Sequence, residues 1–485
     1  MNTLADELKE QEYLGYWWLP VEDGQQEDNR AGVLHFKPDG RANLNLLGAF
    51  ERDVQFLWRH PFKKYPVIQG AAHGLKRFSL FDCVASNQNY NSSEPPELAA
   101  VQIDFIEGWV GQETYSAKDE IQFLNFMAGM HGLASWHNAK AFARKTDWNN
   151  KHTELQYDCP ESVELFKDEH VEISLGYSWQ GASEELAQCE GKISHDPRII
   201  IKSINGKLPY YGECNSYHFY LSRIRSVLGL MVGRGCPLYD CSGLVQKCEL
   251  LKEGEMVPEI VLQHLWRRDV EDIKPISPFD VWLPYEYVAE SLKTAVAGFM
   301  SMDEFPAGLA GHLVYLNASR RTNFTQGALP ELVYMFEGLH KQLYCEGLSQ
   351  REKEKIPLAN RFEDEFSRIG NVFPFIDATT KDSLIKYVKD RRVAFSHANP
   401  DSFQDNIPLY INVTIWMRMF LMAMVLKYCG VPANVLYAAL SKNNEYGHIA
   451  KHMPLLLQNE SQQSYPPRDA IECFKNGDAT ERRND

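Results

Sequence analysis

The chain has 485 residues, of which 44% are hydrophobic and 24% are charged. These are the proportions of a folded protein with a buried core, and at this length we expect two or three domains. The net charge is −15, which excludes a protein that coats nucleic acid non-specifically, because such a protein is basic. Any contact with nucleic acid must therefore be local.

The sequence predicts a cytoplasmic protein that does not enter a membrane. Its first residues lack the basic and apolar regions of a signal peptide, and no run of 18 apolar residues occurs. The most apolar stretch, residues 415–425, is interrupted by Arg418 and is expected to be a core helix. The ten cysteines show no framework spacing, which favours reduced thiols in a cytoplasm over a disulfide scaffold.

Three cysteines, Cys236, Cys241 and Cys248, lie close together in the sequence. Their spacing is not that of a paired zinc motif, and no histidine follows at a ligand offset, so buried thiols are favoured over a structural metal. His131 and His137 flank a short segment without nearby carboxylates, which is more typical of a loop than of a metal site. We expect neither a metal nor a cofactor.

The first half of the chain has the alternating pattern of β-strands. Asp39-Gly40 lies between two alternating segments and predicts a hairpin over residues 32–46. Further strands are predicted at 99–105 and 171–175. Asn205-Gly206 is a second candidate for a tight turn, which would join strands at 198–202 and 208–211. An apolar stripe with helical spacing covers 217–232, whereas 257–265 fits a strand or a short helix.

The pattern changes near residues 275–284, where prolines mark a joint between domains. Helices are predicted from there on, at 286–300, 330–346, 356–369, 381–397, 409–428 and 432–440. The fold class is therefore α+β. We predict a β-rich N-terminal domain at 1–275, an all-α domain at 285–460 and a polar tail at 461–485 that is expected to be disordered.

The stretch from Arg391 to His397 carries the chemistry of interest. Arg392 and His397 place a fixed cation five positions from a group that titrates near neutral pH. An arginine can stabilise the phosphate dianion of a transition state, and a histidine can move the proton of a ribose 2′-hydroxyl. The predicted helix also has three more positive than negative charges, from Lys381, Lys386, Lys389, Arg391 and Arg392 against Asp382 and Asp390. These features predict a ribonuclease that needs no metal.

Alternative readings of this stretch remain open. Arg30 and His35 have the same spacing within a predicted strand, and we assign them no function. An arginine on an apolar helix face is more often ion-paired than catalytic, and here Glu363 or Glu365 of the preceding helix is the expected partner. The buried stripe of the helix is expected to include Leu384, Ile385, Val388 and Phe395.

The spacing also limits the geometry. Residues five apart on a helix point about 140° apart around its axis. Arg392 and His397 can therefore meet only if the histidine stands at a frayed helix end, or if two copies of the helix meet across a two-fold axis. Motifs of other chemistries do not occur in the chain, including the nucleophile elbow, the zinc-binding helix, the phosphate loop and the dinucleotide fingerprint.

The stretch from Asp390 to His397 resembles the Arg-x4-His element of HEPN domains in prokaryotic defence and toxin proteins. Residues 14–20, 32–36 and 44–48 are similar to the N-terminal domain of ApeA-like HEPN proteins. The resemblance implies a HEPN-type helical bundle and a metal-independent ribonuclease that acts as a homodimer, with the arginine and histidine of both chains in one cleft. It also implies an antiphage effector that cuts RNA, frequently tRNA, by 2′-hydroxyl attack and halts growth of the infected cell.

Carried over by position, the resemblance implies Arg392 as the transition-state cation and His397 as the general acid and base. Arg391, Lys389 and Lys386 would bind the substrate RNA. Many family members have a polar residue after the arginine, where this chain has Val393. If Arg391 is the functional arginine instead, the spacing to the histidine is longer by one residue.

The β-rich domain would sense a phage-derived trigger or restrain the nuclease. The alternative hypothesis is a non-catalytic helical module for dimerisation or nucleotide binding, attached to a ligand-binding β domain. Val393 and the acidic net charge favour this alternative.

Overall fold

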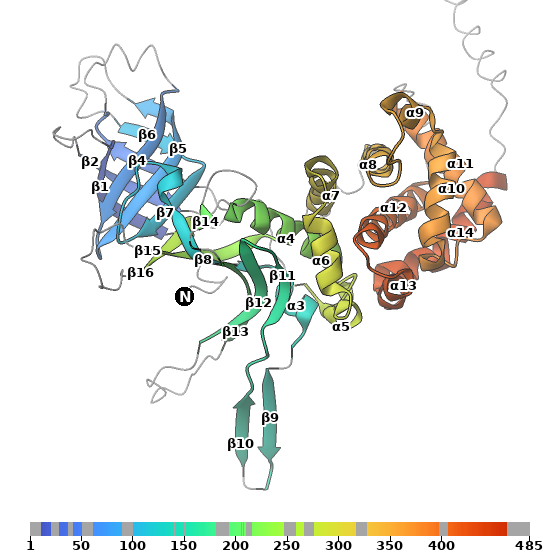
Figure 1. Cartoon of the computed structure of the whole chain (residues 1–485), viewed down its shortest axis with the longest axis horizontal. Coiled ribbons are helices and arrows are strands. Elements are labelled where there is room, and N and C mark those ends of the chain that lie inside the picture. Colours follow the sequence, from blue (N-terminus) through green and yellow to red (C-terminus); the bar gives the residue numbers. More distant parts are fainter. Residues whose placement is uncertain are drawn as a thin grey trace, which may run out of the picture. The chain divides into compact units, whose positions relative to one another are not determined.

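The computed structural model forms two compact units, one of residues 1–320 with 428–431 and one of residues 321–427 with 432–485 (Figure 1). Each unit is described by itself. The structure describes residues 11–20, 29–36, 42–50, 62–89, 100–139, 141–149, 151–180, 194–204, 206, 208–209, 216–246, 259–265, 276–316, 327–396 and 406–462.

Six antiparallel strands of the first unit close into a barrel in the order β5-β4-β1-β2-β3-β6, because β6 pairs with β5 as well as with β3. The long strand β5 also pairs with β7 (Glu107–Gly111), and it therefore links the barrel to a second sheet. The barrel strands are β1 (Gln11–Trp18), β2 (Arg30–Phe36), β3 (Ala42–Leu47), β4 (Lys64–Ala72), β5 (Lys76–Asn89) and β6 (Ala100–Asp104).

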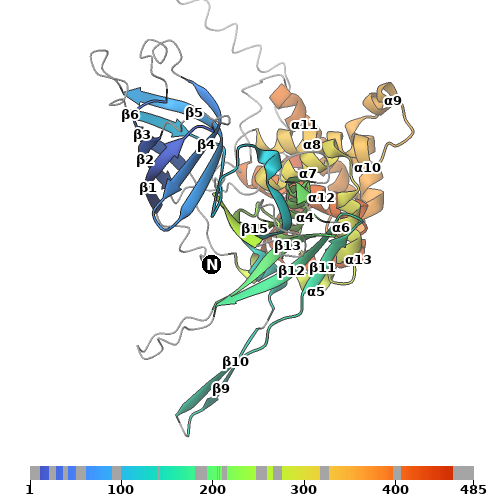
Figure 2. The same ribbon diagram turned by 60° about the vertical axis from the view of Figure 1, so that its left-hand side comes forward.

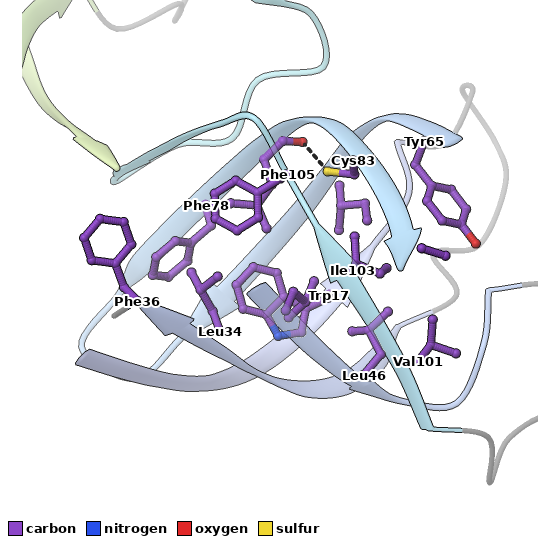
Figure 3. Packing of buried hydrophobic residues seen from close by; sticks show 14 of the residues in the cluster. Trp17, Leu34, Phe36, Leu46, Tyr65, Phe78, Cys83, Val101, Ile103 and Phe105 are labelled. Atoms are coloured by element: carbon purple, nitrogen blue, oxygen red, sulfur yellow. Dashed lines mark hydrogen bonds between the residues drawn. The ribbon is translucent and has the colours of Figure 1, made fainter. Parts of the chain in front are cut away.

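Side chains fill the inside of this barrel. Trp17 is completely buried at its centre (Figure 3). Its indole N–H donates to the carbonyl oxygen of Gly32 at 3.2 Å. The Trp17 ring leaves no room for a side chain at Gly70, where a Cβ would come within 2.2 Å of it. Alternate residues such as Leu34 and Phe36 complete the core. A small barrel with a packed interior is a structural core.

The second sheet of this unit has the strand order β11-β12-β13-β8-β15-β16-β7. Helix α4 (Tyr217–Val232) packs against β8 and β13. The centre of its Tyr217 ring lies 4.3 Å from the centre of the Phe126 ring. Two further strands, β9 (Phe142–Asp147) and β10 (His152–Tyr157), form a separate two-stranded sheet (Figure 2). The remaining strands are β7 (Glu107–Gly111), β8 (Gln122–Met130), β11 (Val163–Lys167), β12 (Val171–Gln180), β13 (Ser194–Ser203), β15 (Leu238–Gln246) and β16 (Glu259–Leu265).

Three helices that follow the strands belong to the first unit: α5 (Tyr285–Val288), α6 (Leu292–Met300) and α7 (Glu304–Leu316). α6 packs against α4 and β11, and α7 packs against α4. The guanidinium of Arg223 in α4 donates to the carbonyl oxygen of Phe299 in α6 at 3.1 Å. The chain thus changes from strands to helices before it reaches the division between the two compact units. The domain bounds of 1–275 and 285–460 that the sequence suggested stay a prediction.

The second unit is all-helical. Its central helix, α12, is long and apolar enough to cross a membrane, but 89% of its most apolar window is buried in the protein. That burial is expected of a core helix. Trp416 and Phe420 of α12 pack with the rings of Phe362 and Phe366. The helices are α8 (Ala328–Leu343), α9 (Gln350–Lys355), α10 (Leu358–Ile369), α11 (Ala378–Ser396), α12 (Ile407–Tyr428), α13 (Ala433–Leu440) and α14 (Asn444–Gln462).

The α+β fold class is confirmed, and so is the hairpin of β2 and β3. The two strands on either side of the tight turn expected at Asn205-Gly206 do not pair with each other, and Asn205 itself lies outside the described residues. β14 (Leu208–Pro209) pairs with β8, because β13 already has β12 on one edge and β8 on the other. Residues 259–265 form a strand, so the strand is correct and the short helix considered for this segment is not.

One predicted helix is divided. Residues 286–300 form two helices, and the Ser291 hydroxyl between them donates to the carbonyl oxygen of Val288 at 3.3 Å. A serine hydroxyl that bonds a backbone carbonyl three residues earlier competes with helix continuation. The polar tail expected from residue 461 begins inside α14, and residues 463–485 lie outside the described part of the chain.

Candidate functional site

Arg392 lies one turn before the end of α11 and faces α8. Its Nε and Nη2 donate to Oε2 of Glu337 at 3.1 and 2.9 Å, and its guanidinium carbon lies 5.4 Å from the centre of the Tyr334 ring. Its side chain remains 33% exposed. Glu337 therefore fixes one edge of the guanidinium, while the Nη1 side has no partner among the residues that the structure describes.

A second contact joins the same two helices. The Tyr334 hydroxyl lies 2.7 Å from Oγ of Ser396, which in turn donates to the carbonyl oxygen of Arg392 at 2.9 Å. Tyr334 and Glu337 are three residues apart on α8, so they are neighbours on the helix surface. α8 thus holds both the side chain of Arg392 and the last turn of α11.

Arg391 has different surroundings. Its Nη2 lies 3.9 Å from Oε1 of Glu460 in α14, its guanidinium covers the Tyr387 ring at 4.9 Å, and only 12% of its side chain is exposed. The two neighbouring arginines therefore contact two different helices. Greater exposure makes Arg392 the better candidate for contact with a substrate.

The structure does not test whether Arg392 and His397 come together, because His397 lies outside the described residues. α11 ends at Ser396, the residue directly before it. Lys386 and Lys389 are exposed on the same helix, where they can meet an anionic partner. The roles of these four residues stay predictions.

Two local expectations for this helix were wrong. The arginines pair with Glu337 and Glu460, whereas Glu363 pairs with Lys381 at 2.6 Å and Glu365 is completely buried with no hydrogen-bond partner among the described residues. Phe395 is also not part of the buried stripe, since it is substantially exposed near the helix end.

A buried polar cluster holds α8 against α10. His340 is almost completely buried, with Nε2 at 2.9 Å from Oδ2 of Asp364 and Nδ1 at 3.1 Å from Nη1 of Arg361. Arg361 has only donors, so Nδ1 accepts and Nε2 carries the proton given to Asp364. Burial lowers the pKa of His340, although Asp364 opposes that shift. A neutral imidazole bonded on both nitrogens is a structural group that keeps α8 in place.

The described residues contain no group of three or more side chains suited to a metal ion. Cys236 and Cys241 are buried, and burial raises the pKa of the Cys236 thiol to about 12, so that it stays protonated. Cys248 lies outside the described residues. Nδ1 of His137 lies 2.7 Å from the Tyr177 hydroxyl, within a cluster of aromatic rings.

Comparison with known proteins decides the family. The model of the ApeA N-terminal domain 1 matches residues 12–294, which is more than half of the chain. The chain belongs to the ApeA family. No curated protein and no solved structure matches it significantly.

Membership of the ApeA family indicates an effector of antiphage defence. The matched residues cover the barrel, the second sheet, α4 and α5, and they end within α6. The match stops before α8, so the helices that carry Arg392 are not part of it. The resemblance of residues 14–20, 32–36 and 44–48 to the ApeA N-terminal domain is therefore confirmed, whereas the HEPN assignment stays a prediction.

Sequence reasoning missed Glu337 and Tyr334, which the fold brings to Arg392. The local signal was present, because an acidic and an aromatic residue three apart on a predicted helix share one face. Their partner, however, lies 55 residues beyond Glu337 in the sequence. No spacing rule connects α8 to α11 across that distance.

Proposed function

We propose that this ApeA-family protein is a metal-independent endoribonuclease of antiphage defence, located in the cytoplasm. The observation that supports the proposal best is the state of Arg392. A carboxylate orients one edge of its guanidinium, the rest is accessible, and a histidine follows five positions later. An oriented, accessible guanidinium suits a phosphate that gains charge in a transition state.

In the proposed reaction, His397 accepts the proton of a ribose 2′-hydroxyl, and the 2′-oxygen forms a bond to the adjacent phosphorus. The bond from phosphorus to the 5′-oxygen breaks, and that oxygen receives a proton from a second acid. The products are a 2′,3′-cyclic phosphate and a 5′-hydroxyl. Arg392 stabilises the phosphoryl oxygens while charge accumulates on them.

Two proton-transfer groups are needed, and one helix supplies one histidine. We therefore propose that the protein acts as a homodimer, or a higher homo-oligomer, in which the second chain contributes the other histidine. Transfer RNA is the proposed substrate, and its cleavage would arrest growth of the infected cell. The β-rich first unit would respond to a phage-derived trigger.

The proposal is tested with purified full-length protein, total tRNA and EDTA. His397→Ala and Arg392→Ala should abolish cleavage, while circular dichroism shows an unchanged fold. His35→Ala is the matched control, since Arg30 and His35 share the spacing but lie on strand β2. Cleavage that survives both changes, or that requires a divalent ion, contradicts the proposal.

The non-catalytic module remains the second candidate, because the ion pair of Arg392 with Glu337 is also what a structural arginine forms. That candidate predicts RNA binding without turnover and no effect of His397→Ala on affinity. Sequencing of RNA ends from cells that induce the wild type or Arg392→Ala separates the two. New ends with cyclic phosphates, present only in the wild type, identify both the substrate and the cut position.

A further inference from the structure

Tyr334 is an aromatic side chain at the candidate site for which the proposed reaction has no use. We propose that an unpaired base of the RNA stacks on the Tyr334 ring and thereby places the neighbouring phosphate against Arg392. This inference rests on the proposed function, because it assumes that RNA is the ligand of this site. It adds a substrate class, namely RNA with an unpaired base next to the cleaved linkage.

The first support is the position of the ring. Tyr334 is 43% exposed, although the guanidinium of Arg392 lies 5.4 Å from its centre. The ring therefore contacts the candidate phosphate-binding cation and solvent at the same time. By contrast, Phe336 on the same helix is completely buried in the aromatic core. A ring beside a cation matches the way proteins bind single-stranded nucleic acid, with a base on the aromatic face and a phosphate on the charge.

The second support is that the ring is held in one orientation. Ser396 Oγ donates its only hydrogen to the carbonyl oxygen of Arg392, so the Tyr334 hydroxyl must donate to Ser396 Oγ. The hydroxyl of Tyr334 is thus hydrogen-bonded to α11, while the guanidinium of Arg392 lies over the ring. A platform that is already ordered loses little conformational entropy when a base binds.

This arrangement implies selectivity. Bases inside an RNA duplex are stacked on each other and cannot reach a side chain, whereas those in loops and single strands can. Tyr334 thus directs cleavage to loops. Because Ser396 directly precedes His397, the same hydrogen bond also anchors the chain at the residue before the proposed acid and base.

The test uses full-length His397→Ala protein, which should not cleave, and a hairpin RNA with 2-aminopurine in its loop. Stacking on Tyr334 quenches the fluorescence of this base. Tyr334→Leu should lose the quenching and weaken binding by about 5- to 150-fold, the equivalent of about 1 to 3 kcal/mol per stacked base. Tyr334→Phe keeps the ring but loses the hydrogen bond to Ser396, so it should keep the quenching and bind with an affinity between those of the parent and Tyr334→Leu, which guards against a folding defect.

Tyr437 provides the matched control, because it is 41% exposed on α13 of the same unit and has no contact with Arg392 among the described residues. Tyr437→Leu should quench and bind like the parent. Equal quenching by Tyr334→Leu and the parent, equal losses in both leucine variants, or no RNA binding by the parent would each overturn the inference. Failure of the proposed function is distinguishable, since it appears as uncut RNA with the wild-type protein while Tyr334-dependent quenching persists.

Discussion

Arg198 in the strand-rich unit and Arg392 in the helical unit are both held by carboxylates, but to different extents. The three nitrogens of Arg198 bond to Ser178, Asp196 and Asp240, and only 6% of its side chain is exposed. Arg392 has one carboxylate and an accessible edge. A guanidinium in which every nitrogen is bonded to the protein is a structural cross-link, whereas one with an accessible nitrogen can bind a ligand.

The buried carboxylates of the two units also differ in whether they have a partner. Asp240 lies beside Arg198, and burial raises the pKa of Asp240 although the arginine opposes the shift. Glu365 on α10 is completely buried, and its two oxygens have no hydrogen-bond partner among the described residues. Burial raises the pKa of Glu365 to about 8, so that it is largely protonated at neutral pH. In the strand-rich unit, the cation of Arg198 balances the charge of buried Asp240. In the helical unit, buried Glu365 is instead neutralised by binding a proton.

The largest effect on stability is expected from Arg198→Met. The change leaves the buried Asp240 and the partly exposed Asp196 without their counter-charge, and the loss at Asp240 costs about 3 to 5 kcal/mol. Calorimetry should show a lower melting temperature for the first unit. Arg368→Met is the control, since Arg368 makes an exposed pair with Asp364 that is worth at most about 1 kcal/mol. Similar losses in both variants would contradict the comparison.

Arg392→Lys should leave stability nearly unchanged and lower cleavage by about 10²- to 10³-fold. Lysine keeps the charge, but it cannot hold Glu337 on one edge and a phosphate on another. Single-turnover rates on a defined RNA measure the effect. Arg391→Lys should change the rate only a few-fold, because Arg391 is directed to Glu460. The opposite ranking would assign the catalytic role to Arg391.

Glu365→Gln should stabilise the protein increasingly as the pH rises. The pKa of Glu365 is about 8 in the folded state and about 4.3 in the unfolded state, so the wild type loses stability as the pH climbs through that window. Glutamine does not titrate, and the gain should reach on the order of 2 to 4 kcal/mol at pH 8 and be smallest at pH 5. Urea unfolding at both values measures it.

Glu363→Gln is the control for this pH dependence. Glu363 lies on the same helix but is exposed and paired with Lys381. Its replacement should give the same small change at pH 5 and at pH 8. A pH-independent difference for Glu365→Gln as well would show that its carboxyl titrates normally in the folded protein.

Glu337→Gln should slow cleavage by about 10- to 100-fold, because the guanidinium loses the charge that sets its direction and a small misplacement of a reacting group carries a cost of that size. The retained amide oxygen can still accept one hydrogen bond, so the loss is smaller than for Arg392→Lys. Affinity measured with the His397→Ala background should change little. Faster cleavage by Glu337→Gln would mean that Glu337 restrains Arg392 rather than positions it.

Much of the fold could be predicted from the sequence wherever apolar residues keep a clear period. The helix predicted at 217–232 has the same limits as α4, which Gly233 ends with a φ of +91°. No helix was predicted over the residues of α7 and α14, and each of these helices contains a proline. Pro306 lies in the first turn of α7, where a missing N–H is tolerated, but Pro454 lies in the interior of α14, where a proline is unfavourable.

The site could be predicted only in part. The positions of Arg392, Lys386 and Lys389 on one helix followed from local spacing. The contacts of Arg392 with Glu337 and Tyr334 depend on how α8 packs against α11, and local periodicity does not specify which helices meet. The same limit explains why Glu363, on the helix that precedes α11, was the wrong partner for the arginines.

Lys389→Ala should have the smallest effect of these changes on RNA binding. Unlike a change at Tyr334, it should alter the salt dependence of that binding. Lys389 is exposed on α11 and makes no ion pair among the described residues, so it can neutralise one phosphate. Its loss should weaken RNA binding a few-fold and reduce the salt dependence of the logarithm of affinity by roughly 0.7. Titrations between low and moderate salt measure this slope. Lys442→Ala, which removes an exposed charge after α13, should leave it unchanged. Stacking on Tyr334 releases no counterions, so a changed slope in Tyr334→Leu would mean that the ring acts through Arg392 instead of holding a base.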